Sequence, residues 1–257
     1  MKKRLLFLGA CILLGACQNP STPQQSSDST QVTTQQKLSK TDVLNKQIEA
    51  AKTIKSLAMD IDVKVKVDET KMEQVILKNS VELIMDPLTM KMNMQAFGVE
   101  SEFYYVNDKY YVKVNGEWIE SNGDVNNQIN STKNQFNALE NLNQEYATVD
   151  EKDAYYLVNV DLVDKEKIED YLKSSLYGSG NDSLINSMMQ SGGTIDKITA
   201  SYKVDKKTFY LMESEGSIIM TVPNGGNKQT VAIDFTAHYK DVNAVKSIEL
   251  PNDLPNR

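Results

Sequence analysis

From residue 59 onward, apolar and polar residues alternate along much of the chain. In residues 59–67 every second side chain is apolar and those between are Asp or Lys. Because successive strand side chains point to opposite faces, this pattern predicts a half-buried strand. Similar segments follow, separated by turn signals such as Asp86-Pro87 and Asn115-Gly116. The predicted strands are 59–67, 71–85, 89–97, 99–106, 109–114, 117–119, 154–162, 194–204, 208–222, 230–239 and 245–250.

Four other segments carry apolar residues at the spacing of a helix. They span residues 39–57, 126–146, 164–177 and 182–190. Ser39 or Thr41 can cap the first helix, and Asp164 can cap the third. Short turns between strands predict antiparallel pairing, and the helices must cover the apolar strand faces. We therefore predict an α+β fold: one large curved antiparallel sheet, an open half-barrel, with the helices packed on its concave face.

The chain begins with a different pattern. Lys2, Lys3 and Arg4 precede an apolar run that ends at Gly15-Ala16-Cys17. The run is about 12 residues long, shorter than the ~20 that a membrane-spanning helix needs, and it matches an export signal. Its last four residues resemble the lipobox of bacterial lipoproteins. The resemblance implies that residues 1–16 are a cleaved signal peptide and that Cys17 carries a diacylglyceryl anchor.

The residues after Cys17 change the picture again. Residues 17–38 are rich in Ser, Thr, Gln and Pro, and they contain a single valine and no aromatic residue. Such a segment buries too little apolar surface to fold, so we predict a flexible tether. Residues 39–257 then form one domain. The expected location is the extracytoplasmic face of the cell membrane, and the Ser/Thr/Gln tether favours a Gram-positive surface.

Charge excludes several partners. The chain has 28 basic and 35 acidic residues, and losing the three basic residues of the leader leaves 25, for a net charge of −10. This acidity argues against nucleic acid as a partner. Cys11 would leave with the leader and Cys17 would be acylated, so no disulfide is expected. The sequence does not indicate an oligomeric state.

Two local motifs suggest a family. Residues 109–118 read as a strand, Asn-Gly and Trp, and residues 248–251 close the domain with Ile-Glu-Leu-Pro. With the order of helices and meanders, they resemble the LolA and LppX group of bacterial lipoprotein and lipid carriers, in an uncharacterised Gram-positive branch. The resemblance implies binding of an acyl chain, a lipid or a lipidated partner between sheet and helices. It implies no catalytic residues and no cofactor.

Methionines are the main candidates for a ligand surface. Met90, Met92 and Met94 share one face of a predicted strand, and Met85 lies just before it. Methionine is flexible and polarizable, so it suits a wall that accepts variable apolar shapes, although an ordinary core under the helices is the more common reason for such a row. The predicted lining residues of a hydrophobic-ligand site are Met85, Met90, Met92, Met94, Ile129, Phe136, Leu139, Met188 and Met189.

The polar residues give no sign of an enzyme. His238 is the one histidine, on the polar face of its strand, and no metal-binding or catalytic motif accompanies it. Tyr and Trp residues on the strands at 99–119 could form a binding platform or simply stabilise the sheet. We therefore predict a binding lipoprotein without catalytic or metal residues. The alternative is a structural or protein-interaction lipoprotein, adhesin-like, with a filled core.

Overall fold

The computed structural model describes residues 37–67, 72–114, 116–121, 139–140, 142–172 and 189–255. Residues 38–257 form one compact unit, and residues 1–37 form a separate unit. The predicted signal peptide and nearly all of the predicted tether lie outside the described residues.

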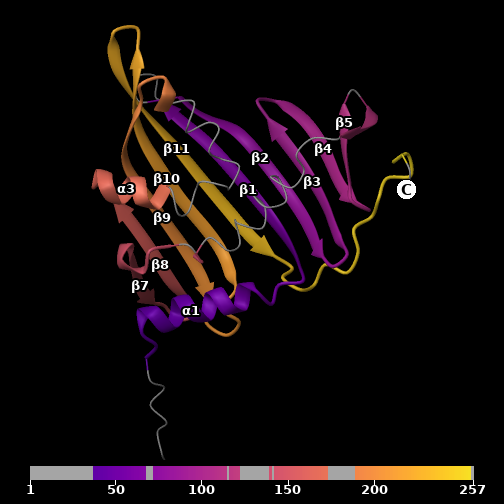
Figure 1. The fold of residues 1–257 in the computed structure, drawn as a ribbon, viewed down its shortest axis with the longest axis horizontal. Coiled ribbons are helices and arrows are strands. Elements are labelled where there is room, and N and C mark those ends of the chain that lie inside the picture. The colour runs from indigo at the N-terminus through magenta and orange to yellow at the C-terminus, as the bar shows by residue number, and fades with distance from the viewer. Residues whose placement is uncertain are drawn as a thin grey trace, which may run out of the picture. The chain divides into compact units, whose positions relative to one another are not determined.

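Eleven strands form a single antiparallel sheet, in the order β6-β5-β4-β3-β2-β1-β11-β10-β9-β8-β7 (Figure 1). The strands are β1 (Ser56–Val67), β2 (Met72–Met85), β3 (Leu88–Ala96), β4 (Val99–Val106), β5 (Lys109–Val114), β6 (Glu117–Ser121), β7 (Ala147–Glu151), β8 (Tyr155–Leu162), β9 (Thr194–Asp205), β10 (Leu211–Asn224) and β11 (Asn227–Lys240). The sheet is open, since its edge strands β6 and β7 do not pair with each other. The predicted α+β class with one large open antiparallel sheet is confirmed.

The sheet consists of two meanders that meet in its middle. Strands β1 to β6 follow one another along the chain, as do β7 to β11. They are joined where β1 pairs with β11, from Ala58 opposite Lys240 to Val67 opposite Val231. This long-range pairing places the apolar residues of both meanders on one face, because residues directly opposite each other in an antiparallel pair share a face.

Two helices cover part of that apolar face. Helix α1 (Lys40–Ala51) begins with a capping box between Ser39 and Asp42, and it buries Val43 and Leu44. Helix α3 (Lys165–Tyr171) is capped by Asp164, as predicted, whose side chain accepts hydrogen bonds from the backbone N–H groups of residues 166 and 167. Both helices pack their apolar sides onto residues of β7 to β11 in the largest core cluster.

The first helix is shorter than predicted. It ends at Ala51, and β1 begins at Ser56 instead of Met59. The intervening backbone is held by the sheet: Lys55 N–H donates to Asn243 Oδ1 at 2.6 Å, and Met85 N–H donates to Lys55 O at 2.8 Å. These non-local bonds override the helical pattern of residues 52–57.

The end of the second predicted helix is also wrong. Residues 144–146 form a short 3-10 turn, η1 (Gln144–Tyr146), and Ala147–Glu151 form edge strand β7, which the pattern did not predict. The side chain of Asn143 accepts a hydrogen bond from Glu145 N–H and so starts the turn. Lys40 Nζ then donates to the carbonyls of Gln144 and Ala147, which ties α1 to this edge.

The predicted strand at 245–250 is wrong as well. Residues 245–254, called here the C-terminal strap, are not a strand. Ile248 and Leu254 are buried against Tyr104 and Tyr111 in a small separate cluster. These tyrosines lie on the face of the sheet opposite the main core, so the strap covers the outer face of β4 and β5. Side-chain burial, and not strand pairing, holds the strap in place.

We predict that Gly216→Ala destabilises the domain by about 1–3 kcal/mol, as overpacking does. Gly216 lies opposite Phe235 in the β10–β11 pair. A Cβ atom at this position would meet the Phe235 ring and lie 2.5 Å from the backbone oxygen of Thr199. The free energy of unfolding in urea measures the effect. Glu215→Ala on the neighbouring exposed position is the control, and equal stability of both variants would contradict the prediction.

We predict that Leu254→Ala loosens the strap and lowers the free energy of unfolding by roughly 2–3 kcal/mol, at the lower end for a buried leucine. Trp118 packs against the same cluster and is the one tryptophan. Its fluorescence emission should shift to the red as water reaches it. Lys246→Ala in the exposed part of the strap should change neither quantity. An unshifted spectrum for Leu254→Ala would show that the strap does not shield Trp118.

Candidate functional site

The predicted methionine surface lies on the apolar face of the sheet. Along β3 the alternation brings Met90, Met92 and Met94 to that face, where Met90 is opposite Leu83 of β2 and Tyr105 of β4. Met90 is completely buried. Met92, Met94 and Met85 are partly buried and pack against the same core cluster. The structure therefore brings the four methionines together in one apolar region.

Aromatic rings border this methionine surface. The rings of Phe103 and Tyr110 stack with centroids 5.8 Å apart. Tyr105 O–H donates to Asp108 Oδ1 at 3.0 Å, which satisfies the hydroxyl at the end of a buried ring. Burial, followed by this hydrogen bond, raises the pKa of Tyr105. The surface thus combines flexible methionines with fixed rings, which are the side chains that commonly line apolar ligand sites.

The other predicted lining residues lie elsewhere. Leu139 is buried in the larger cluster with α1 and α3, away from the methionine cluster. Met189 is 42% exposed. Ile129, Phe136 and Met188 lie outside the described residues. The structure therefore does not bring the predicted lining set together as one surface; the four methionines are the part that it places side by side.

A set of buried hydroxyls, missed by the sequence analysis, lies within the apolar face. The hydroxyls of Tyr171 and Tyr202 are 3.2 Å apart, joining α3 to β9. Ser214 Oγ is 3.3 Å from the Tyr239 hydroxyl, joining β10 to β11. Three of the four stand at apolar-face positions of the strand alternation, so a search for hydroxyls at inward positions would have found them.

Burial controls the ionisation of these tyrosines. It raises the pKa of Tyr239 to about 12, although the hydrogen bond with Ser214 opposes the shift. Burial also raises the pKa of Tyr202 and of Tyr171. All three are neutral hydroxyls near neutral pH, so they can donate or accept hydrogen bonds inside the apolar face without burying a charge there.

The predicted aromatic platform is divided between the two faces of the sheet. Tyr105 and Tyr110 lie on the apolar face with the methionines. Tyr104 and Tyr111 lie on the outer face with Trp118, beneath the strap. The ring of Tyr104 meets that of Trp118 edge-to-face at 5.4 Å. Neighbouring residues of a strand point in opposite directions, so the five rings cannot form one platform.

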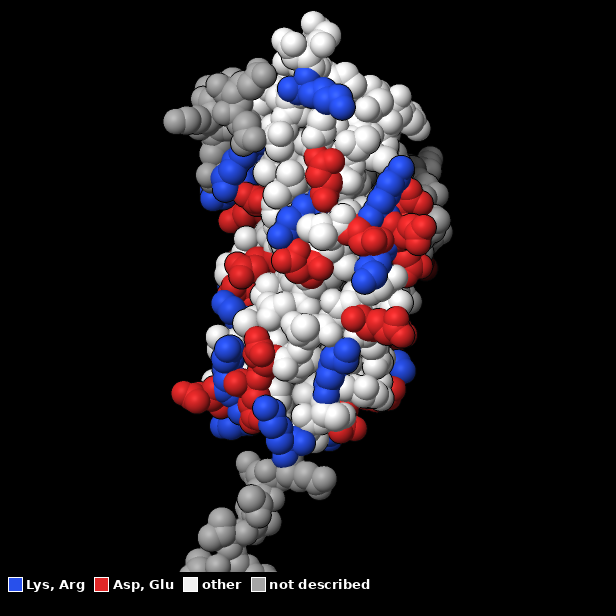
Figure 2. All heavy atoms as spheres, turned by 90° about the vertical axis from the view of Figure 1, so that its left-hand side faces the viewer, with Lys and Arg blue, Asp and Glu red and all other residues white. Residues whose placement is uncertain are grey.

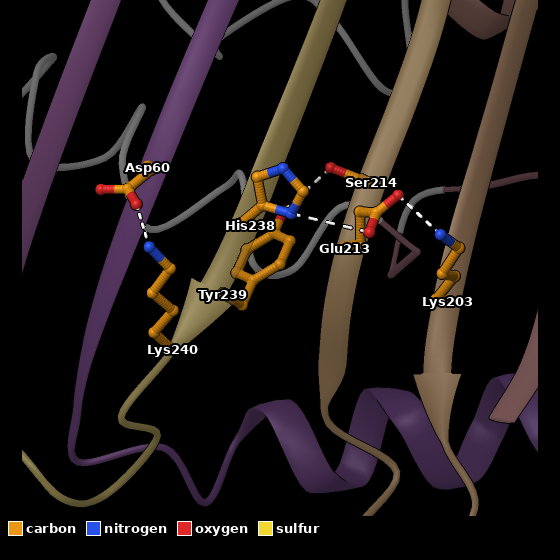
Figure 3. Close-up of polar contacts among 7 residues, drawn as sticks. All are labelled: Asp60, Lys203, Glu213, Ser214, His238, Tyr239 and Lys240. Atoms are coloured by element: carbon orange, nitrogen blue, oxygen red, sulfur yellow. Dashed lines mark hydrogen bonds and ion pairs between the residues drawn. The ribbon is translucent and has the colours of Figure 1, made fainter. Parts of the chain in front are cut away.

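The outer face carries a row of charges across four strands (Figure 3). Lys240 of β11 pairs with Asp60 of β1. His238 is half exposed, and its Nδ1 lies 3.6 Å from Glu213 Oε2 of β10. The other oxygen of Glu213 accepts from Lys203 of β9 at 2.7 Å. These are cross-strand pairs on an exposed face, and His238 lies on the polar face of its strand as predicted.

Two hollows also open on the outer face. One has a volume of about 890 Å³ and is lined by β1 to β5, and the other has about 610 Å³ and is lined by β1 and β8 to β11. Asp62 of β1 lines both. Polar residues outnumber apolar ones around both hollows, although Val160, Ala200 and Phe235 also line the second, so the hollows differ in chemistry from the methionine surface on the opposite face.

Three further observations concern surface charge, metal ligands and hydropathy. Figure 2, which faces the side that lies on the left in Figure 1, shows basic and acidic side chains interspersed over the domain. Within the described ranges, no three His, Cys, Asp or Glu residues are grouped as metal ligands would be. No helix in those ranges is sufficiently long and apolar to cross a bilayer.

Residues 39–256 match the model of a family described as "Family of unknown function (DUF6612)". No curated protein matches the chain.

Similar solved structures include the Mycobacterium tuberculosis lipoprotein LppX, at 11% identity over 83% of this chain and 100% of that one, with a TM-score of 0.44. LprF from Mycobacterium bovis is 12% identical over 84% of this chain and 97% of its own, with a TM-score of 0.44. A LolA superfamily protein from Nitrosomonas europaea is 10% identical over 84% of this chain and 96% of its own, with a TM-score of 0.25. These proteins are of the group that the sequence resembles.

We predict that stability falls between pH 10 and pH 12, partly because of Tyr239. In the unfolded chain tyrosine ionises near pH 10, whereas in the folded chain Tyr239 ionises near 12. The unfolded state therefore loses its proton first, and roughly 2–3 kcal/mol present below pH 10 is lost as pH rises through the folded pKa. Tyr239→Phe should flatten this slope in urea unfolding. An unchanged slope would contradict the assignment, and Tyr155→Phe on the outer face is the control.

Proposed function

The chain belongs to DUF6612, a family of unknown function, and we propose that it is a membrane-anchored surface lipoprotein that binds an acyl chain or lipid without catalysis. Residues 1–16 are the signal peptide, Cys17 carries the anchor, residues 17–38 are the tether and residues 39–257 are the binding domain. The anchor holds the domain on the extracytoplasmic side of the cell membrane, on a Gram-positive surface. Two acyl chains on Cys17 are sufficient for stable attachment.

The observation that carries the proposal is the methionine surface. Met90, Met92 and Met94 stand in a row on the apolar face, and Met85 packs against the same cluster. Four methionines in one cluster form a wall that can adjust to an inserted chain, since each side chain has three rotatable bonds. The ligand lies against this wall on the apolar face of the sheet. The tether keeps the domain close enough to the bilayer to take up a lipid from it.

A filled core with a structural or interaction role is the second candidate, and one observation favours it. Met90 is completely buried, and it packs directly with Leu83 and Tyr105 in the same cluster. A side chain that is already enclosed leaves no surface for a ligand at its own position. Under this alternative the outer face of the sheet would meet a protein partner.

The variant Met92→Trp separates the two candidates. In a ligand cavity the larger side chain occupies the ligand's space, so bound lipid should fall while the free energy of unfolding of the ligand-free protein stays within about 1 kcal/mol. In a filled core it costs about 1–3 kcal/mol by overpacking. The chain from residue 17, with Cys17→Ser to remove the anchor, is purified without detergent, and native mass spectrometry and lipid extraction measure bound lipid.

Met212→Trp is the matched control, since Met212 on β10 is 43% exposed. It should alter neither lipid content nor stability. Lipid bound by the parent and the control but lost in Met92→Trp supports the carrier. A parent free of lipid after purification and after incubation with phospholipid vesicles, together with a destabilised Met92→Trp, would establish the filled core. When residues 1–257 are expressed, the protein with an intact Cys17 should fractionate with membranes, and its Cys17→Ser variant should appear in the medium.

A further inference from the structure

The two hollows of the outer face share Asp62 in their linings, and together they are called here the transverse groove. Its ends are Lys113 of β5 and Asp161 of β8, and Asp62 lines both hollows. From β5 to β8 there are nine neighbouring strands in the sheet, with both end strands counted. With strands spaced about 4.8 Å apart, the groove is roughly 35–40 Å long. It crosses the strands instead of following them, so it suits a linear ligand laid across the sheet.

Ion pairs border the middle and the far end of the groove, and each joins a lysine to a carboxylate. Lys66 Nζ lies 2.7 Å from Asp234 Oδ2. Lys197 Nζ lies 3.0 Å from Asp161 Oδ1 at the far end. These pairs fix the charged side chains of β1, β11, β9 and β8. Because each of these charged groups already has a partner in the sheet, it has less hydrogen-bonding capacity left for a ligand.

The amide and hydroxyl side chains of the groove, in contrast, have no partner within the described residues. Asn93 and Gln95 stand two residues apart on β3, and Ser80 lies opposite Asn93 on β2. Asn159 and Ser201 lie opposite each other on β8 and β9 in the second hollow. Each amide offers two donors and an acceptor oxygen. Both halves of the groove therefore present neutral hydrogen-bonding side chains that can bond to a ligand in place of water.

The lining restricts the chemistry of a ligand. Seven carboxylates and four lysines line the two hollows, an acidic balance that opposes nucleic acid and other polyanions. Most of the residues that line the groove are charged or neutral polar ones, which opposes an acyl chain. A peptide strand binds through a sheet edge with free backbone groups, whereas the groove lies on a face whose backbone groups are already paired in the ladder. Recognition there depends on side chains alone.

We propose that the transverse groove binds a linear, uncharged oligosaccharide. Neighbouring hydroxyl groups of a sugar supply donors and acceptors side by side, which planar amides such as Asn93 and Gln95 can match two at a time. Repeating sugar units meet repeated groups across successive strands, so both hollows contribute to one chain. This site is on the opposite face from the methionine surface, and it does not depend on lipid binding.

The test is isothermal titration of the Cys17→Ser chain with chitohexaose, cellohexaose and maltohexaose. At least one should bind. Asn93→Ala/Gln95→Ala in one hollow and Asn159→Ala/Ser201→Ala in the other should each weaken its affinity about tenfold, since two neutral hydrogen bonds are lost in each. Gln74→Ala, an exposed amide of β2 outside the groove, is the control and should bind as the parent does.

Circular dichroism and urea unfolding should show that the variants fold like the parent. Binding that both double variants weaken and the control retains supports the proposal. It is overturned if none of the three hexasaccharides binds, if binding survives both double variants, or if a lysine-rich decapeptide binds the parent and the sugars do not. Met92→Trp should leave sugar binding unchanged, so failure of the lipid proposal and failure of this one are separate results.

Discussion

Pairing of β1 with β11 holds the two meanders of this domain in one sheet. Residues 58–67 meet residues 231–240 in an unbroken antiparallel register. Without this pairing, each meander would expose an edge strand and half of an apolar face, and exposed edges invite association with other chains. With it, one continuous apolar face must be covered by α1, α3 and other segments. The partners are about 170 residues apart in the chain, so their pairing is costly in loop entropy and forms late.

The two faces of the sheet carry two chemically different surfaces, for which we propose two different ligands. The methionine surface and the buried hydroxyls belong to the apolar face, which suits a flexible hydrophobic ligand. The transverse groove and the charge row belong to the outer face, which suits a hydrophilic one. The C-terminal strap covers Tyr104 and Tyr111 at one end of the outer face and thereby removes these two rings from that surface. A lipoprotein with both faces in use could hold lipid and contact surface glycans at the same time.

Local patterns predicted the strands well and the boundaries of other elements less well. The alternation at 59–67 and at 230–239 is also the alternation of buried and exposed sides in β1 and β11. The failures have specific causes. Asn243 and Met85 draw residue 55 into the sheet and shorten the first helix. Residues 245–254 look like a strand but find burial against rings, which no pattern within the strap could indicate.

The candidate sites show the same difference between what local sequence patterns predict and what long-range contacts decide. Sequence alone predicted the α+β class and the methionine row correctly, because each depends on composition or on neighbours within a few residues. The leader, the Cys17 anchor and the tether are predictions of the same kind, and nearly all of their residues lie outside the described ones. Tertiary structure decided that the C-terminal strap covers Tyr104 and Tyr111, that Leu139 lies in a different cluster from the methionines, and that the hollows lined by Asn93 and by Asn159 share Asp62. Those relations depend on strand order and on which residues meet across β1 and β11. Long-range pairing sets them, and the local sequence pattern carries no record of it.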